Sequence, residues 1–125
     1  MLFRSAAIAA VHAEAKTAAG TDWKQIAALY RELVAIHPSA TVSLNQSVAV
    51  AMSEGPAQGL AFLDRIGSSG ALEGYHLYYV ARADFLRRLS RKKESIEEYR
   101  KALSLTANAV ERRFLRRRIG ELEGE

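Results

Sequence analysis

The chain has 125 residues, 49% of them hydrophobic and 26% charged, so it has the length of one domain and can bury a core. It contains no cysteine, which excludes a disulfide scaffold, a cysteine-ligated zinc site and a cysteine nucleophile. It also has no uncharged apolar run long enough to cross a membrane. Alanine is abundant, and apolar residues never alternate with polar ones over the length of a strand. The composition predicts an all-α protein, and the lack of cysteine suits a reducing cytoplasm.

Helix-start and helix-stop signals divide the chain into seven predicted helices. Gln25 follows Asp22 at the spacing in which each side chain can bond a free amide of the first helical turn. Pro38 ends the helix that begins there, and Gly55 with Pro56 separates the next two. The predicted helices cover residues 3–16, 22–36, 41–54, 56–66, 75–89, 92–105 and 108–122.

Three of these helices resemble one another at a regular interval. Residues 30–33 align with 63–66, which lie 33 positions later, and with 99–102, which lie a further 36 positions on. Two helices in about 34 residues is the spacing of tetratricopeptide (TPR) repeats, which stack because one hairpin cannot bury both its faces. We therefore predict a single domain over 1–125, a right-handed TPR-like helical-repeat solenoid of three degenerate hairpins and a capping helix. The hairpins are expected at about 3–37, 41–67 and 75–106, and the cap at about 108–122.

The net charge of +4 is unevenly distributed. Residues 1–66 balance five basic against five acidic side chains, whereas residues 82–118 contain thirteen basic and only five acidic ones. This asymmetry indicates either an acidic partner, nucleic acid included, or solvated outer faces of the last helices.

Several long segments carry a specific resemblance that extends over nearly the whole chain. They are AAIAAVHAEA (6–15), TDWKQIAALY (21–30), SLNQSVAVAM (43–52), GPAQGL (55–60), GYHLYYVARADFLRRL (74–89) and ERRFLRRRIGEL (111–122). Together they resemble the C-terminal, TPR-like extension of a subgroup of extracytoplasmic-function (ECF) RNA polymerase sigma factors. The resemblance implies a regulatory domain attached in cis to a sigma factor. Its implied partners are the N-terminal sigma domains, core RNA polymerase or a regulatory protein, with DNA reached through the holoenzyme.

The two promoter-reading domains of a sigma factor are absent from this sequence. Met1 is therefore expected to mark a boundary within a longer protein or a shortened reading frame. Residues that bind core polymerase or promoter DNA in the family cannot be transferred to this chain.

Arg82 lies at the centre of an apolar, tyrosine-rich stripe of its predicted helix. An arginine in such a place is expensive to bury unless it is paired. One interpretation is an internal ion pair with Asp22, Glu54 or Glu98. The other places Arg82 in a concave groove, where it would bind a carboxylate of a partner segment.

Three further residues are candidates for the same groove. Asn45 lies beside an apolar face and could bond the backbone of an extended peptide, or instead a neighbouring helix. Gln46 precedes Arg82 by 36 positions, which favours a shared groove, and Tyr79 lies one turn before Arg82. Gln46 and Tyr79 stand where the family favours Arg and His, so any role that needs those charges is not expected here.

No motif indicates an enzyme, a metal site or a cofactor. His12, His37 and His76 are the only histidines, and none has a second ligand at metal-binding spacing. His76 is flanked by tyrosines and is expected to be a packed or capping side chain rather than an acid or base.

The last predicted helix, which Asn108 and Glu111 open with capping-box spacing, is rich in arginine. Its basic surface is formed by Arg112, Arg113, Arg116, Arg117 and Arg118. Arginines on one helix can contact phosphates, but no helix-turn-helix signature or stacking platform accompanies them. A solvated or protein-facing cap is the alternative.

The sequence predicts a non-enzymatic, cytoplasmic protein-interaction domain that modulates transcription initiation as an ECF sigma-factor extension. Two alternatives remain: a stand-alone TPR-like adaptor that binds a peptide in its groove, and a DNA-contacting module that uses the arginine-rich helix. A homodimer is also possible, because the first and last helices each expose a face.

Overall fold

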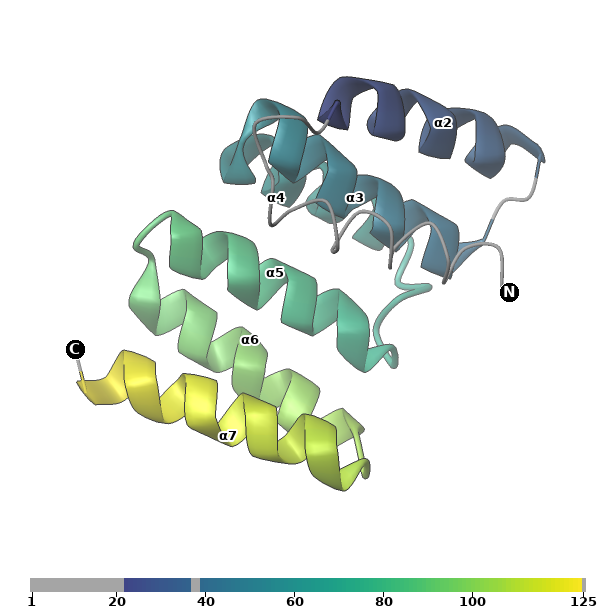
Figure 1. The fold of residues 1–125 in the computed structure, drawn as a ribbon. Helices are drawn as coiled ribbons and strands as arrows, with labels where there is room; N and C mark the ends of the chain where they lie inside the picture. The colour runs from purple at the N-terminus through teal and green to yellow at the C-terminus, as the bar shows by residue number, and fades with distance from the viewer. Residues whose placement is uncertain (1–21, 37–38, 125) are drawn as a thin grey trace.

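The computed structural model describes residues 22–36 and 39–124, and within them the chain is helical with no strand (Figure 1). The helices are α2 (Trp23–Ile36), α3 (Ala40–Glu54), α4 (Pro56–Gly67), α5 (His76–Arg88), α6 (Lys92–Leu105) and α7 (Ala109–Gly124). The all-α prediction is confirmed for this part of the chain, and the predicted helix ends lie within two residues of the observed ones. The helix predicted at 3–16, half of the first hairpin, lies outside the described residues.

One half of each predicted capping box is present, the bond to the N-cap side chain, whereas the Glu111 carboxylate contacts His76 and Thr106 instead. The backbone N–H of Gln25 donates to Asp22 Oδ1 over 3.0 Å, and that of Glu111 donates to Asn108 Oδ1 over 2.9 Å. Pro56 is the first residue of α4, where its missing N–H leaves no bond unmade. Gly55 alone joins α3 to α4 and has φ +103°, a conformation that side-chain-bearing residues rarely adopt.

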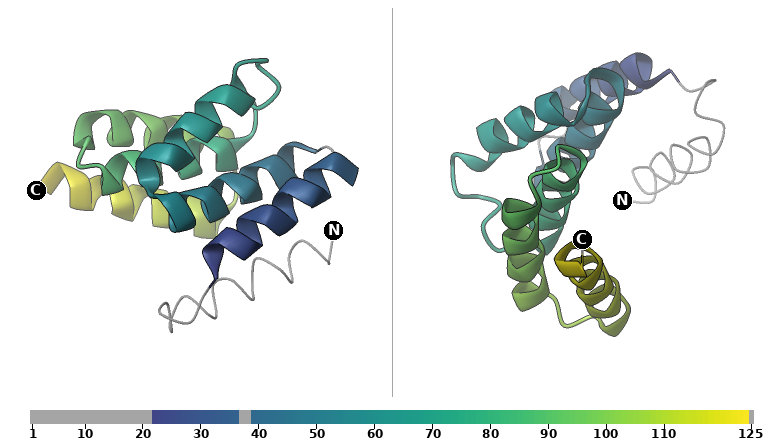
Figure 2. Two further views of the ribbon diagram at one scale, coloured as in Figure 1. Left: turned by 90° about the horizontal axis from the view of Figure 1, so that it is seen from above. Right: turned by 90° about the vertical axis from the view of Figure 1, so that its left-hand side faces the viewer.

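Helices that follow one another in sequence pack against one another from α2 to α7, and α3 also contacts α5 across the α4 connection. The views in Figure 2 show this succession of neighbouring helices from two further directions. A side-chain bond between His76 and Glu111 links the first turns of α5 and α7. The helices α3, α5 and α7 are thus linked to one another as well as to α4 and α6.

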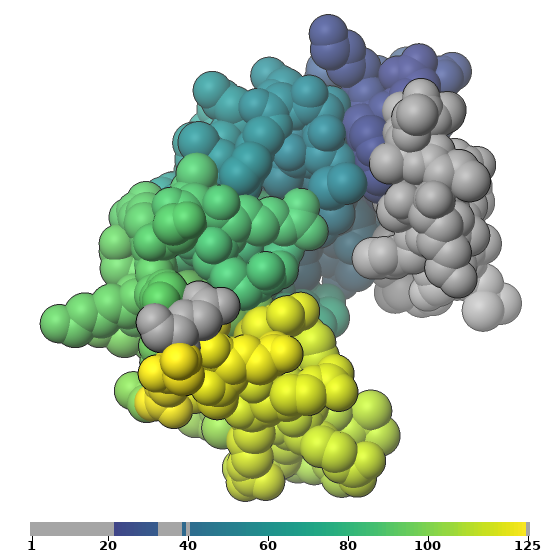
Figure 3. Space-filling view, turned by 60° about the vertical axis from the view of Figure 1, so that its left-hand side comes forward, coloured from purple at the N-terminus to yellow at the C-terminus, as the bar shows by residue number. Residues whose placement is uncertain are grey.

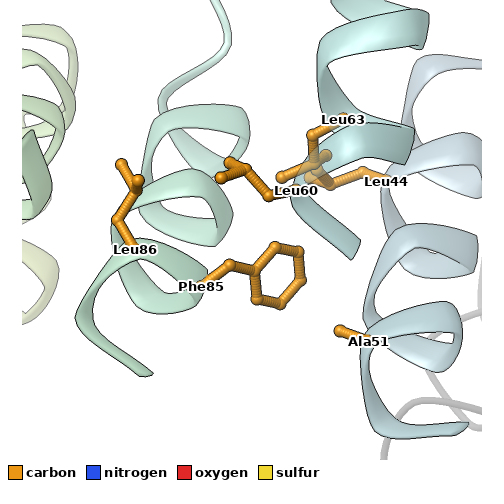
Figure 4. Packing of buried hydrophobic residues seen from close by; sticks show 6 residues of the cluster. All are labelled: Leu44, Ala51, Leu60, Leu63, Phe85 and Leu86. Atoms are coloured by element: carbon orange, nitrogen blue, oxygen red, sulfur yellow. The ribbon is translucent and has the colours of Figure 1, made fainter. Parts of the chain in front are cut away.

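Three buried clusters run along this stack. The first joins α2 to α3, the second joins α3, α4 and α5, and the third joins α5, α6 and α7. Figure 4 shows the second cluster, in which Phe85 of α5 points toward Leu60 of α4 and Ala51 of α3. Because α3 and α5 each supply side chains to two clusters, the core is continuous along the described helices.

Candidate functional site

An apolar cleft of about 390 Å³ lies in the described surface. Its walls come from α2, α3, α5 and α7, with one residue from α6. Among its lining side chains are Trp23, Ile26, Val48, Met52, Val80 and Phe114. In the space-filling view of Figure 3, α2 and α7 lie at opposite ends of the molecule with α5 between them. The cleft is of the size and chemistry that proteins use for binding apolar ligands or side chains.

Few polar groups enter this cleft. The Tyr30 hydroxyl and Asn45 Nδ2 are buried there, and neither has a hydrogen-bond partner among the described residues. Burial raises the pKa of Tyr30 above its ordinary value. Asp84 and Arg88, the charged lining residues, pair with each other over 3.1 Å. The cleft therefore carries little net charge, and these two polar atoms are buried in its wall.

Arg82 forms the internal ion pair that the sequence predicts, with one expected and one unexpected partner. Its guanidinium donates to Asp64 Oδ1 of α4 over 2.7 Å and lies 3.4 Å from Glu98 Oε1 of α6. Burial lowers the pKa of Arg82, but these two carboxylates outweigh that effect and raise it above its ordinary value. Glu98 was among the candidate partners, whereas Asp64 was not. In the structure Arg82 joins three helices.

The four predicted groove residues do not share one groove. Arg82 and Tyr79 line a second, polar pocket of about 280 Å³, in which the Tyr79 hydroxyl donates to the Glu73 carbonyl over 2.9 Å. Asn45 lines the apolar cleft instead. Gln46 is 9% exposed and lines neither. Asn45 and Gln46 are thus separated by the packing of α3, which presents Asn45 to the cleft and buries Gln46.

The five arginines of the predicted basic surface on α7 fall into two groups, those with partners within the chain and those without. Arg112 donates to the carbonyls of Leu103 over 2.6 Å and of Thr106 over 2.9 Å, so it caps the end of α6. Arg118 pairs with Glu121 over 3.4 Å and lies over the Phe114 ring.

The other three arginines of α7 are exposed, namely Arg113, Arg116 and Arg117. Within the described part of the chain they have no ion pair or hydrogen bond. These three, rather than all five, remain available to a partner.

His76 has a partner that sequence reasoning missed. Its Nε2 lies 2.6 Å from Glu111 Oε2, and the other carboxylate oxygen of Glu111 accepts a bond from the Thr106 hydroxyl over 3.2 Å. The two residues are 35 positions apart, and no local pattern signals their contact. Within the described residues no three His, Asp or Glu side chains come together as metal ligands, and no helix is long and apolar enough to cross a membrane.

Comparison with known proteins gives one informative similarity. The chain is 38% identical over 120 residues to an uncharacterized protein of Rhizobium meliloti (strain 1021). The match covers 96% of this chain but only 28% of that relative. No protein-family model and no solved structure matches the chain. What is similar to this chain is therefore a part of a longer protein.

Proposed function

We propose that this chain is a non-enzymatic protein-interaction domain that modulates transcription initiation as the extension of an ECF-type sigma factor. The observation that carries the proposal is the apolar cleft, which is lined by helices of a continuous stack. Its walls come from helices of successive hairpins, the arrangement by which helical repeats bind partner segments. In this proposal the stack is a right-handed TPR-like solenoid, and the contact between α3 and α5 across α4 supports it.

The length of the relative supports an appended domain. A segment similar to this chain forms 28% of that protein, which leaves room for further domains in the same polypeptide. In a cis arrangement the cleft would be held near the sigma domains at high effective concentration, which would increase the occupancy of a contact of moderate affinity. The partners we propose are those sigma domains, core polymerase or a regulatory protein, with a cytoplasmic location.

The direct test is binding of the purified chain to cognate core polymerase and, separately, to ECF sigma domains from the same organism. We expect micromolar or tighter binding to at least one of them (about −8 kcal/mol). Leu77→Asp should weaken this binding, because Leu77 lines the cleft and is 38% exposed.

Leu29→Asp is the matched control for Leu77→Asp. Leu29 lies on α2 outside the cleft and is 59% exposed, so the same change should leave binding unaltered. No binding of either protein by the wild-type chain would contradict the sigma-factor proposal and favour an adaptor with a different partner.

A DNA-contacting module is the second candidate, because Arg113, Arg116 and Arg117 are exposed and unpaired in the described structure. Contacts to phosphates release counterions, so this function requires an affinity for duplex DNA that falls steeply as the salt concentration rises. Titration with duplex DNA at two salt concentrations separates it from the protein-binding function.

A further inference from the structure

The apolar surface of the cleft continues outward onto α7. Phe114 lines the cleft and is 36% exposed, and Val110, one turn earlier on the same side of α7, is 70% exposed. The bond between His76 and Glu111 brings the first turn of α5 beside that of α7. The neighbours of this pair, Leu77 and Val110, are both exposed apolar residues. Leu77 lines the cleft itself, whereas Val110 continues the apolar strip along α7 outside it.

A basic edge lies next to this strip. At about 100° per residue, Arg117 lies about 60° from Phe114 around α7, and Arg113 lies about 60° from Val110. Both are on the side of Phe114 away from the buried Leu115. Arg116 lies about 160° from Phe114, on another face. Arg113 and Arg117 therefore form an uncompensated pair of positive charges, one turn apart, along the outer edge of the apolar strip.

The cleft itself does not balance these charges. Its charged residues, Asp84 and Arg88, are paired with each other, and Glu121 of α7 is bonded to Arg118. The surface is thus apolar in its centre and positive along one edge.

We propose that the occupant of the cleft is an amphipathic helix of a partner protein whose polar face is acidic. Its apolar side chains fill the cleft and cover Leu77, Val110 and Phe114, and carboxylates one turn apart on it face Arg113 and Arg117. This inference rests on the proposed protein-interaction function and names the chemistry of the partner. A DNA duplex fits less well, because it offers no apolar face for the strip beside the arginines.

The probe for the test is a fluorescein-labelled synthetic helix of about 18 residues, with leucine along one face and glutamate on the other. The matched peptide carries lysine in place of each glutamate. Fluorescence anisotropy should show that the acidic peptide binds the wild-type chain at least about tenfold more tightly than the lysine peptide. The double variant R113E/R117E should reverse this preference, whereas R116E should change the acidic peptide's affinity by less than about twofold.

Leu77→Asp should weaken the binding of both peptides, because both contact the apolar part of the surface that this change alters. Circular dichroism of every variant verifies that the helices remain folded. Equal binding of the two peptides, or equal effects of R116E and R113E/R117E, would overturn the proposal. The proposal would also be overturned if R113E/R117E lost binding to duplex DNA but bound the peptide unchanged. A wild-type dimer that buries Val110 and excludes the peptide would overturn it as well.

Failure of this inference is distinguishable from failure of the sigma-factor proposal. In one outcome the chain binds sigma domains or polymerase, R113E/R117E leaves this binding intact, and the acidic peptide is not preferred. That outcome would support the sigma-factor proposal and contradict the proposal that the partner segment is an acidic helix. Selective binding of the acidic peptide without binding to sigma domains or polymerase would support the inference and overturn the sigma-factor partner.

Discussion

His76 of α5 and Glu111 of α7 form a side-chain bond of 2.6 Å across 35 positions of sequence. The backbone N–H of Glu111 also donates to Asn108 Oδ1, and its carboxylate accepts a bond from the Thr106 hydroxyl. The bond thus connects the first turn of α5 to the loop and helix start that follow α6. The sequence neighbours of the two bonded residues, Leu77 and Val110, are exposed apolar side chains.

We expect the bond between His76 and Glu111 to stabilise the fold by about 1 kcal/mol, as a half-buried hydrogen bond does. His76→Ala and Glu111→Ala should each lower the free energy of unfolding in urea. The double variant should lose less than the sum of the two single losses, because the second change removes a bond already broken. Additive losses in this double-mutant cycle would contradict an energetic coupling of the two residues.

Arg82→Ala should lower the stability by about 2 kcal/mol, which is less than for a fully buried pair because Asp64 is exposed to solvent. The loss arises mainly at Glu98, which is 8% exposed and would keep only Lys101, at 3.4 Å, as a partner. Urea unfolding measures the effect.

Arg82 also allows a test of groove recognition. If Arg82 acted by binding a partner's carboxylate, Arg82→Ala would abolish partner binding without changing the melting temperature. The paired guanidinium predicts the opposite result, a lower melting temperature and partner binding through the apolar cleft that is little altered. An unchanged melting temperature would contradict the structural role.

Gly59→Ala should destabilise the protein by about 1 to 3 kcal/mol, because added atoms in a packed core force their neighbours apart. A Cβ at this position would lie 2.5 Å from the Ala51 Cβ and 3.0 Å from the Phe85 ring. The control is Gly120→Ala on α7, where a Cβ meets nothing within 4 Å. That change should stabilise the helix by about 0.5 to 1 kcal/mol. The melting temperatures of the two variants should therefore shift in opposite directions from that of the wild type.

Stability should decline at alkaline pH because of buried tyrosines. Burial raises the pKa of Tyr99, and an unfolded chain would release this proton near pH 10. The contribution is fully present below the unfolded pKa and is lost as the pH rises through the higher folded pKa. Between these values the unfolded state binds fewer protons than the folded state, so the free energy of unfolding falls with rising pH.

Tyr99→Phe should reduce this alkaline slope and leave the pH dependence between about 5 and 8 unchanged, since tyrosine does not titrate there. Urea unfolding at a series of pH values measures both ranges. An alkaline slope identical in wild type and variant would show that Tyr99 does not contribute to it.

The sequence alone determined the helices and where they begin and end. The signals at Asp22, Gly55, Pro56 and Asn108 act over one to four residues, because caps and backbone geometry are local. These local signals, which mark the starts and ends of helices, made an all-α fold predictable. It also made clear that Arg82 needed an ion partner, since an arginine on an apolar stripe is unstable unless it is paired.

Only the tertiary structure decided which residues meet. Asp64 reaches Arg82 from another helix, and Glu111 reaches His76 across 35 positions, so neither contact leaves a trace at helical spacing. Arg112 and Arg113 are adjacent in sequence, yet Arg112 caps α6 and Arg113 faces solvent. The physical reason is that the rotation of a helix about its axis is set by the packing of its buried face. That rotation assigns each arginine and each apolar side chain to the core, the cleft or the solvent.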